Sequence, residues 1–273
     1  MRKEFMSFKD KISKLKIGST VKYNPIQVGS HTIDSNSFTL VAGPCAVENY
    51  NQLKITAEKV KQCGVHILRA GAYKPRTSPY AFQGLGMKGL SILHQIKNEL
   101  QIPIITELLD SRDLDFVTEV ADIIQIGSRN MQNFSLLKSL GHINQPILLK
   151  RGVSATLEEF LLAAEYILDA GNEKVILCER GIRSYDSVTR NLLDLSAVAI
   201  LKQVTHLPIF VDPSHATGIP EIITPMSIAA KSAGANGIMV EIHPSPQEAL
   251  SDGDQALNFE KFDYLISSLG LCA

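Results

Sequence analysis

The chain has 273 residues, of which 45% are hydrophobic and 20% charged, and its formal net charge is -1. This length suits one large α/β barrel or two smaller domains. The near-neutral charge excludes a general attraction to nucleic acid or to anionic membranes, so any function that needs positive charge must concentrate it locally.

The sequence indicates neither a membrane span nor a secretory signal. Its apolar runs are about five to eight residues long, whereas a bilayer requires roughly 20, and the first residues, MRKEFMSFKDKISKLKIGS, carry charges throughout. The four cysteines, Cys45, Cys63, Cys178 and Cys272, show no paired spacing. We therefore expect a cytoplasmic protein with reduced thiols, in which Cys63 and Cys178 are structural.

Residues 1–37 predict a short N-terminal extension. A helix over Glu4–Leu15 is followed by two alternating runs, VKYNPIQV and HTID, joined near Gly29, which indicate a hairpin. The segment is too short for an independent regulatory domain.

From residue 38 to the end of the chain, short apolar runs alternate with amphipathic stretches. The runs are FTLVAG, HILRAG, PIITEL, DIIQIG, PILLKRG, KVILCERG, PIFVDPSH and GIMVEIHP. Continuous hydrophobicity is typical of parallel strands covered on both faces. Between them lie helical patterns such as LEEFLLAAEYILDAG, which ends at Gly171. Eight units of about 30 residues predict a (β/α)₈ barrel over residues 38–273, with the hairpin closing its bottom and a doubly wound open sheet as the competing architecture.

Nearly every apolar run ends in a charged or metal-competent residue. These residues are Cys45, Arg69, Lys74, Glu107, Arg129, Lys150, Glu179, Arg180, Asp212, His215, Glu241 and His243. In a parallel barrel the strand ends converge on one rim, where barrel enzymes keep their chemistry.

Eight cations fall at or just after strand ends, and we expect them to form one cluster. They are Arg69, Lys74, Arg76, Arg129, Lys150, Arg151, Arg180 and Arg183. Guanidinium groups offer paired donors to phosphate and carboxylate oxygens. The cluster predicts a small substrate with several negative charges.

Four residues could ligate a metal ion: Cys45, His215, Glu241 and Asp252. A thiolate, an imidazole and two carboxylates suit Mn²⁺, Fe²⁺, Co²⁺ or Zn²⁺ better than Mg²⁺. No local spacing supports the site, and the residues alone leave it open, since Cys45 could be a buried hydrophobe and Glu241 could pair with an arginine.

Several long motifs follow one another along the barrel in a fixed order. They are VAGPCAVEN, LRAGAYKPRTSPYAFQGLG, QIGSRNMQNFSLL, PILLKRG, VILCERGIRSYD, TRNLLDLSAV, VDPSHATG and VEIHPSPQEALSDG. This series resembles the 3-deoxy-D-arabino-heptulosonate 7-phosphate (DAHP) synthase family, in the branch related to 3-deoxy-D-manno-octulosonate 8-phosphate synthase. The segment KPRTS favours the heptulosonate side, because the octulosonate branch typically carries an alanine and an asparagine before its arginine.

The resemblance implies a metal-dependent condensation of phosphoenolpyruvate with erythrose 4-phosphate and water, the first step of the shikimate pathway. The implied metal ligands are Cys45, His215, Glu241 and Asp252, with Mn²⁺ expected first and Fe²⁺, Co²⁺ or Zn²⁺ as alternatives. The implied phosphoenolpyruvate ligands are Arg129 with its neighbour Ser128, Lys150 and Arg180 for the phosphate, and Arg69 and Lys74 near the carboxylate. Arg76 and Thr77 would hold the sugar phosphate. Lys150 or Lys74 would donate a proton, and Cys45 and His215 would act in catalysis through the metal.

The sequence departs from the family pattern in the segment after His215. Basic residues often follow the HAxG motif in the family, whereas here Gly218 leads into Ile219 and Pro220. This change is expected to weaken sugar-phosphate binding or to alter closure of the seventh loop. We expect neither a ferredoxin-like domain nor a fused chorismate mutase, and therefore either no feedback inhibition or control through a separate partner such as chorismate mutase. By resemblance we also expect a homodimer or homotetramer.

Three other assignments stay open at this point. The octulosonate synthase would prefer arabinose 5-phosphate. A catalytically silent relative would show damage to the proposed ligands, and none is present. A Schiff-base aldolase is conceivable because Lys150 ends a strand.

Overall fold

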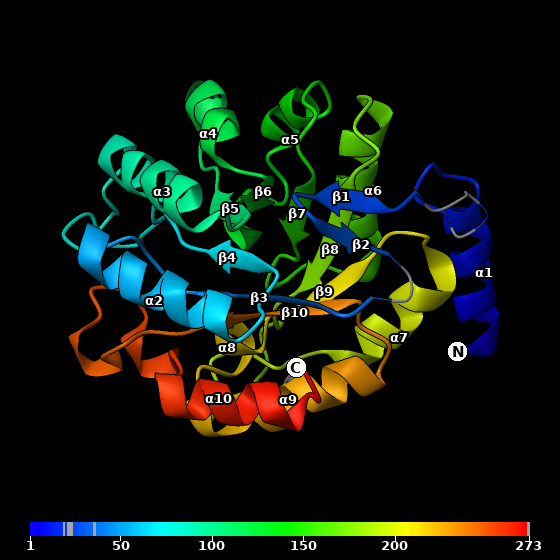
Figure 1. Ribbon diagram of the computed structural model, residues 1–273. Helices are drawn as coiled ribbons and strands as arrows, with labels where there is room; N and C mark the ends of the chain where they lie inside the picture. Colours follow the sequence, from blue (N-terminus) through cyan, green and yellow to red (C-terminus); the bar gives the residue numbers. More distant parts are fainter. Residues whose placement is uncertain (19, 21–23, 35–36, 272–273) are drawn as a thin grey trace.

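Eight strands close into a parallel barrel in the computed structural model, which describes residues 1–18, 20, 24–34 and 37–271 (Figure 1). The strands are β3 (Thr39–Gly43), β4 (Ile67–Arg69), β5 (Ile104–Glu107), β6 (Ile123–Ile126), β7 (Ile147–Lys150), β8 (Val175–Glu179), β9 (Ile209–Val211) and β10 (Gly237–Glu241). The barrel closes where β10 pairs with β3, with Gly237 opposite Thr39. The predicted (β/α)₈ barrel is confirmed, and the open sheet is wrong.

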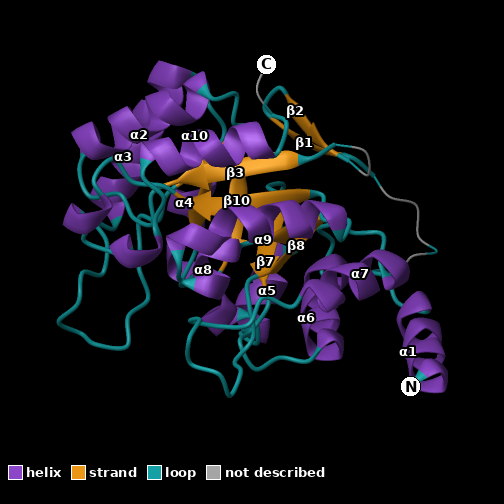
Figure 2. Ribbon diagram, turned by 90° about the horizontal axis from the view of Figure 1, so that it is seen from below, coloured by secondary structure: helices purple, strands orange, loops and turns teal. Residues whose placement is uncertain are grey.

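Helices cover the outside of the barrel (Figure 2). They are α2 (Tyr50–Gln62), α3 (Met87–Leu100), α4 (Leu114–Val120), α5 (Phe134–Leu140), α6 (Leu157–Asp169), α7 (Leu195–Val204), α8 (Pro213–Thr217), α9 (Pro220–Ser232) and α10 (Phe259–Ser268). Short 3₁₀ turns lie at η1 (Ser111–Asp113), η2 (Ser128–Asn130), η3 (Pro246–Glu248) and η4 (Gly253–Gln255). Within the described residues, no helix is both long and apolar enough to cross a bilayer.

The start of α6 shows how local sequence sets these helices. The Thr156 side chain accepts a hydrogen bond from the Glu159 backbone N–H, and the Glu159 carboxylate accepts one from the Thr156 N–H, which completes a capping box. The buried face of the helix includes Phe160, Leu161 and Ala164, at three- and four-residue spacing. Helix α6 therefore lies where the pattern predicted it.

The N-terminal extension forms a helix and a hairpin. Helix α1 spans Arg2–Ser13, about two residues earlier than expected. Strands β1 (Ile26–Val28) and β2 (His31–Ile33) pair antiparallel. Residues 21–23 of the first predicted run lie outside the described residues. Three hairpin side chains, those of Ile26, Val28 and Ile33, join the cluster that fills the barrel interior. The hairpin therefore covers the end of the barrel where the strands begin, opposite their C-terminal ends.

A pair of histidines joins this hairpin to the barrel. The rings of His31 and His66 lie 4.0 Å apart, and His66 Nδ1 accepts a hydrogen bond from the Leu40 backbone N–H at 3.0 Å. Burial and the neighbouring His66 lower the pKa of His31 to about 4, and burial lowers the pKa of His66. Both rings are therefore neutral in the folded protein near pH 7.

We predict that the folded protein loses stability between about pH 6.5 and pH 4. The unfolded chain binds a proton at His31 below its ordinary pKa of about 6.5, whereas the folded chain does not until near pH 4, so acid favours unfolding. His31→Gln should reduce the fall in urea midpoint between pH 7 and pH 5. His94→Gln, at an exposed histidine of α3, should retain the wild-type fall; equal slopes in both variants would contradict the prediction.

Candidate active site

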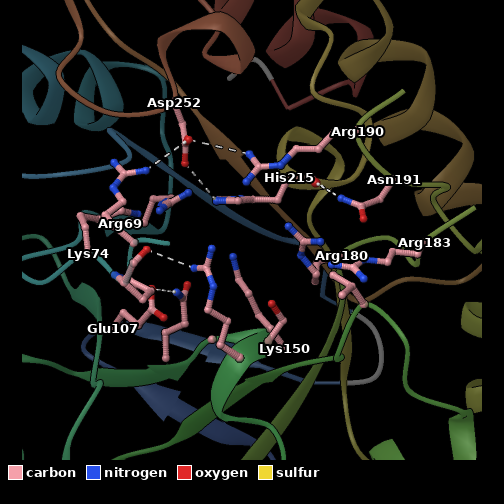
Figure 3. Close-up of a pocket in the computed structure, with 17 residues that line it drawn as sticks. Arg69, Lys74, Glu107, Lys150, Arg180, Arg183, Arg190, Asn191, His215 and Asp252 are labelled. Atoms are coloured by element: carbon pink, nitrogen blue, oxygen red, sulfur yellow. Dashed lines mark hydrogen bonds and ion pairs between the residues drawn. The ribbon is translucent and has the colours of Figure 1, made fainter. Parts of the chain in front are cut away.

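A cavity of about 400 Å³ opens at the C-terminal ends of the barrel strands (Figure 3). Its cationic lining residues are Arg69, Lys74, Arg76, Arg129, Lys150, Arg180, Arg183 and Arg190. The other lining residues are Pro75, Glu107, Gln125, Gly127, Ser128, Val153, Asn191, His215 and Asp252. The charge that the near-neutral chain lacks overall is concentrated here, so the cavity is suited to a polyanionic ligand.

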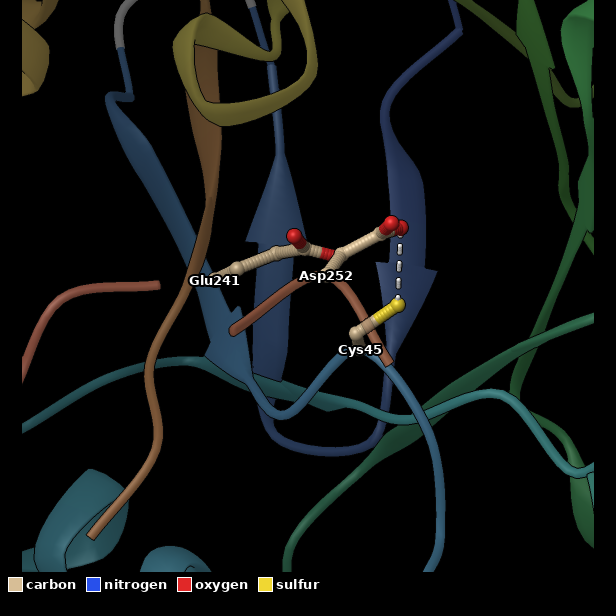
Figure 4. Close-up of side chains that lie close together, drawn as sticks. All are labelled: Cys45, Glu241 and Asp252. Carbon is tan, nitrogen blue, oxygen red and sulfur yellow. Dashed lines mark hydrogen bonds between the residues drawn. The ribbon is translucent and has the colours of Figure 1, made fainter. Parts of the chain in front are cut away.

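The four predicted metal ligands converge on one side of the cavity. Ligand atoms of Cys45, Glu241 and Asp252 all lie within 4.8 Å of one another (Figure 4). Cys45 Sγ is 3.3 Å from Asp252 Oδ2. His215 Nε2 is 3.4 Å from Glu241 Oε1 and 4.0 Å from Asp252 Oδ2. These residues come from the ends of β3 and β10, from α8 and from the residue before η4, so only the closed barrel brings them together.

A buried carboxylate orients the His215 ring. Asp212 Oδ2 lies 2.7 Å from His215 Nδ1, and Asp212 Oδ1 accepts the His215 backbone N–H. Burial lowers the pKa of His215, so the ring is neutral, with the Nδ1 proton donated to Asp212 and the Nε2 lone pair facing Glu241 and Asp252. A carboxylate behind a histidine is the usual outer partner of a metal ligand. The sequence placed Asp212 at the rim but gave it no role.

Asp212 also joins the proposed ligands to Lys150. The Lys150 ammonium lies 2.5 Å from Asp212 Oδ2, and both side chains are buried. Burial opposes the charged form of Asp212, but the hydrogen bond from His215 and the positive charges of Lys150 and Arg69 hold its pKa well below its usual range. The ion pair therefore anchors Lys150 at the base of the cavity.

Arg69 and Gln255 hold Glu241, another of the predicted ligands. Arg69 Nη1 donates to Glu241 Oε1 at 2.8 Å, and Gln255 Nε2 donates to Glu241 Oε2. Burial opposes the charged form of Glu241, but neighbouring cations, Arg69 and Lys74 among them, lower its pKa overall. The carboxylate therefore stays ionised although it is buried.

The thiol and the second carboxylate differ in charge. Burial raises the pKa of Cys45 to about 12, and the carboxylate of Glu241 adds to this effect. Burial also opposes the charged form of Asp252, but nearby positive charges, those of Lys74 and Arg190 included, hold its pKa at about 2. The group thus contains a protonated thiol beside ionised carboxylates, and a bound cation would favour the thiolate.

The far wall of the cavity carries cations with few protein partners. Arg180 is buried, and its Nη1 has no hydrogen-bond partner among the described residues. Burial lowers the pKa of Arg180, which is the mark of a poorly solvated charge. Arg129 is exposed at the mouth, where its Nη1 donates to the Pro75 carbonyl at 3.1 Å, and Ser128 lines the cavity beside it. A buried, unpartnered guanidinium favours a bound anion.

The residues of the KPRTS segment divide between the cavity and its surroundings. Lys74 is buried, and its Nζ donates to the Cys45 carbonyl at 3.3 Å. Arg76 lines the cavity, whereas Thr77 is exposed and is not among the lining residues.

Arg151 corrects the predicted cationic cluster, because it lies outside the cavity lining. Its Nη1 donates to Glu179 at 2.9 Å and to Asp194 at 3.0 Å, and its Nε donates to the Ala155 carbonyl. Consecutive residues at a strand end point to opposite sides, so Lys150 faces the cavity and Arg151 braces the loop behind it. Glu179, also expected at the rim, is its buried partner.

The remaining predictions concern two cysteines and a histidine. Cys178 is fully buried in the barrel interior, as expected, and Cys272 lies outside the described residues. His243 Nε2 lies 3.5 Å from Glu48 Oε1, and its Nδ1 accepts a hydrogen bond from the Ser245 backbone N–H. The sequence analysis missed Arg190, Asn191 and Gln125 as lining residues. The signal for Arg190 and Asn191 was the TRN segment before α7, and Gln125 lay within the DIIQIG run.

Comparisons with known proteins show the family to which this chain is related. The model of the DAHP synthetase I family matches residues 22–269. The phospho-2-dehydro-3-deoxyheptonate aldolase of Thermotoga maritima is 53% identical over 244 residues, covering 89% of this chain and 72% of that protein. The 2-dehydro-3-deoxyphosphooctonate aldolase of Coxiella burnetii (strain RSA 493) is 29% identical over 254 residues, covering 86% of this chain and 89% of that protein.

Two solved structures share the fold. The crystal structure of the Thermotoga maritima DAHP synthase superposes with a TM-score of 0.90 at 50% identity, covering 93% of this chain and 75% of that one. A truncated form of the Thermotoga maritima enzyme gives a TM-score of 0.87 at 47% identity, covering 93% of this chain and 94% of that one.

Proposed function

This chain belongs to the DAHP synthetase I family, and we propose that the cavity at the mouth of its barrel joins phosphoenolpyruvate to erythrose 4-phosphate. Carbon C3 of phosphoenolpyruvate bonds to the aldehyde carbon, water adds at C2 and phosphate leaves. The product is 3-deoxy-D-arabino-heptulosonate 7-phosphate, which begins the shikimate pathway to the aromatic amino acids.

The observation that carries the proposal is the buried guanidinium of Arg180, whose Nη1 has no hydrogen-bond partner among the described residues, in a cavity lined by eight cations. Phosphoenolpyruvate brings a phosphate and a carboxylate. Its phosphate would contact Arg180 and Lys150, with Arg129 and Ser128 at the mouth. Its carboxylate would face Lys74 and the part of Arg69 that Glu241 leaves unoccupied. If both substrates are bound in this way, C3 is held next to the aldehyde carbon. Fixing the two reactants in this geometry would lower the activation barrier by several kcal/mol.

The donors of Cys45, His215, Glu241 and Asp252 fit a divalent cation. Their ligand atoms lie a few ångströms apart, and His215 already presents its lone pair because Asp212 accepts the other ring proton. The mixed thiol, imidazole and carboxylate set suits Mn²⁺, Fe²⁺, Co²⁺ or Zn²⁺. Bound there, the ion would act as a Lewis acid on the aldehyde oxygen or on water.

Lys150 would donate a proton during the reaction, and the water that adds at C2 would release one in return, so that no net proton is consumed. Its ammonium is buried at the base of the cavity, 2.5 Å from Asp212, on the wall that also carries Arg180. From there it can donate to the alkoxide formed from the aldehyde or to the departing phosphate. Asp212 would hold the Lys150 ammonium through their ion pair before the proton transfer. Lys74 would add a second positive charge from another wall of the cavity.

Release of inorganic phosphate tests this function directly. With phosphoenolpyruvate, we expect kcat/KM for erythrose 4-phosphate to exceed that for arabinose 5-phosphate by at least about tenfold. EDTA should stop turnover and Mn²⁺ should restore it. Preference for the five-carbon sugar would reassign the chain to the octulosonate reaction.

Borohydride trapping separates this reaction from a Schiff-base aldolase. Because the Lys150 ammonium is paired with a buried carboxylate, it is a poor nucleophile. We therefore expect no covalent adduct when borohydride is added with both substrates. A substrate-sized mass increase on Lys150 would contradict the proposed chemistry.

A further inference from the structure

Arg76, the arginine expected to hold the sugar phosphate, has protein partners at each of its three nitrogens. Its Nε donates to the Phe82 carbonyl at 3.0 Å, its Nη2 donates to the Ser251 hydroxyl, and its Nη1 lies 3.7 Å from Asp252 Oδ1. A guanidinium has five N–H donors, so Arg76 keeps only part of its capacity for a ligand. A second cation beside Arg76 would add donors for a phosphate.

Arg190 reaches the same carboxylate oxygen from the loop between β8 and α7. Its Nη1 lies 3.8 Å from Asp252 Oδ1 (Figure 3). The same Nη1 donates to Gln255 Oε1 at 2.5 Å. Within the described part of the chain, its Nε and Nη2 have no hydrogen-bond acceptor. The side chain is 41% exposed at the cavity mouth. Arg190 therefore keeps a free pair of donors, unlike Arg76.

The protein holds Arg190 in place from two sides. Gln255 is buried, and its amide orientation is fixed because Glu241 can only accept its Nε2 proton while Arg190 can only donate to its Oε1. The backbone N–H of Arg190 donates to the Thr217 carbonyl at 2.9 Å. The guanidinium is therefore positioned in advance, which reduces the entropy lost when a ligand binds.

Arg190 also packs against the segment after His215, in which Gly218, Ile219 and Pro220 provide no positive charge. Gly218 has φ of +70°, and a Cβ built on it would lie 2.9 Å from Arg190 Cβ and 3.6 Å from its Cδ. The aliphatic part of Arg190 thus packs on this glycine, which leads into Ile219 and Pro220. The charge at this part of the mouth comes from Arg190 instead of from the segment after His215.

We propose that Arg190, positioned by Gln255, binds the phosphate of the aldehyde substrate opposite Arg76. This inference rests on the proposed function of the cavity. Asp252 places both guanidinium groups on its Oδ1 side, while its Oδ2 faces the Cys45 thiol. A phosphate between the two arginines therefore lies beyond the proposed metal ligands, where the far end of a four-carbon aldehyde would reach. Lys150 and Arg180 are buried, at 4% and 5% exposure, and serve the other phosphate.

Arg190→Ala tests the proposal with two aldehydes, erythrose 4-phosphate and unphosphorylated erythrose, each with phosphoenolpyruvate. We expect the KM for erythrose 4-phosphate to rise at least tenfold, while the KM for phosphoenolpyruvate stays within threefold. With erythrose, kcat/KM should fall less than threefold, because the lost contact is to the phosphate. Arg190→Lys keeps one charge but not the paired donors, and should recover part of the loss.

Arg112→Ala is the matched control, since Arg112 is an exposed arginine outside the cavity paired with Asp110. It should leave the KM values of both substrates within twofold. An unchanged KM for erythrose 4-phosphate in Arg190→Ala, or an equal loss with both aldehydes, would overturn the assignment while leaving the proposed function intact. Absence of turnover by the wild-type protein would contradict the proposed function and this inference together.

Discussion

Replacing Cys45 with alanine should lower kcat/KM by about 10³-fold at limiting Mn²⁺, which corresponds to about 4 kcal/mol of transition-state stabilisation. Cys45 Sγ lies within 4.8 Å of a carboxylate oxygen of Glu241 and of Asp252, so that one cation could contact all three. Its removal leaves three donors, and saturating Mn²⁺ should therefore restore only part of the activity. The direct readout is the Mn²⁺ dissociation constant from calorimetry, which should rise by at least tenfold.

Cys178→Ala is the matched control for this experiment. Both thiols are buried in the barrel, but Cys178 packs among the interior side chains and is not part of the proposed ligand group. It should keep the wild-type Mn²⁺ affinity and retain activity within about threefold. Equal Mn²⁺ affinities in wild type and Cys45→Ala would remove Cys45 from the ligand set.

Replacing Lys150 with methionine should lower kcat by about 10³-fold, within the range lost when a positioned proton donor is removed. Methionine keeps an unbranched side chain of similar length but has neither the charge nor the proton. Because Asp212 would lose its cationic partner, the variant should also unfold at lower urea concentration. Steady-state kinetics at saturating phosphoenolpyruvate separate the effect on kcat from weaker binding.

Lys150→Arg distinguishes proton donation from charge alone. An arginine retains the positive charge opposite Asp212 but does not release a proton at neutral pH. It should recover stability and phosphoenolpyruvate binding while kcat stays low. Recovery of kcat to within tenfold of wild type would show that Lys150 only binds phosphate.

The barrel could be predicted because each of its strands corresponds to a continuous apolar run in the sequence. Each of the eight runs became a strand, and many of the charged residues at their ends line the cavity at one rim, with Arg151 and Glu179 as exceptions. The ligand group required the closed barrel as well, since Cys45 and Asp252 are far apart in the chain and approach within 3.3 Å only after folding.

The directions of individual side chains at the site could not be predicted from the sequence, for physical reasons. Lys150 and Arg151 are adjacent and equally charged, and only the direction of each side chain at the strand end assigns one to the cavity and the other to Glu179. Asp252 has a left-handed backbone, with φ of 53°, which no neighbouring residue signalled. Gln255 acts through two partners, Glu241 and Arg190, that are distant in sequence.

A crystal soaked with Mn²⁺ and phosphoenolpyruvate tests the central claim most directly, through the anomalous difference map. We expect one strong peak about 2.0 to 2.5 Å from Cys45 Sγ, His215 Nε2 and the carboxylates of Glu241 and Asp252, with the substrate phosphate on Arg180 and Lys150. A peak elsewhere, or a phosphate bound away from Arg180, would contradict the account.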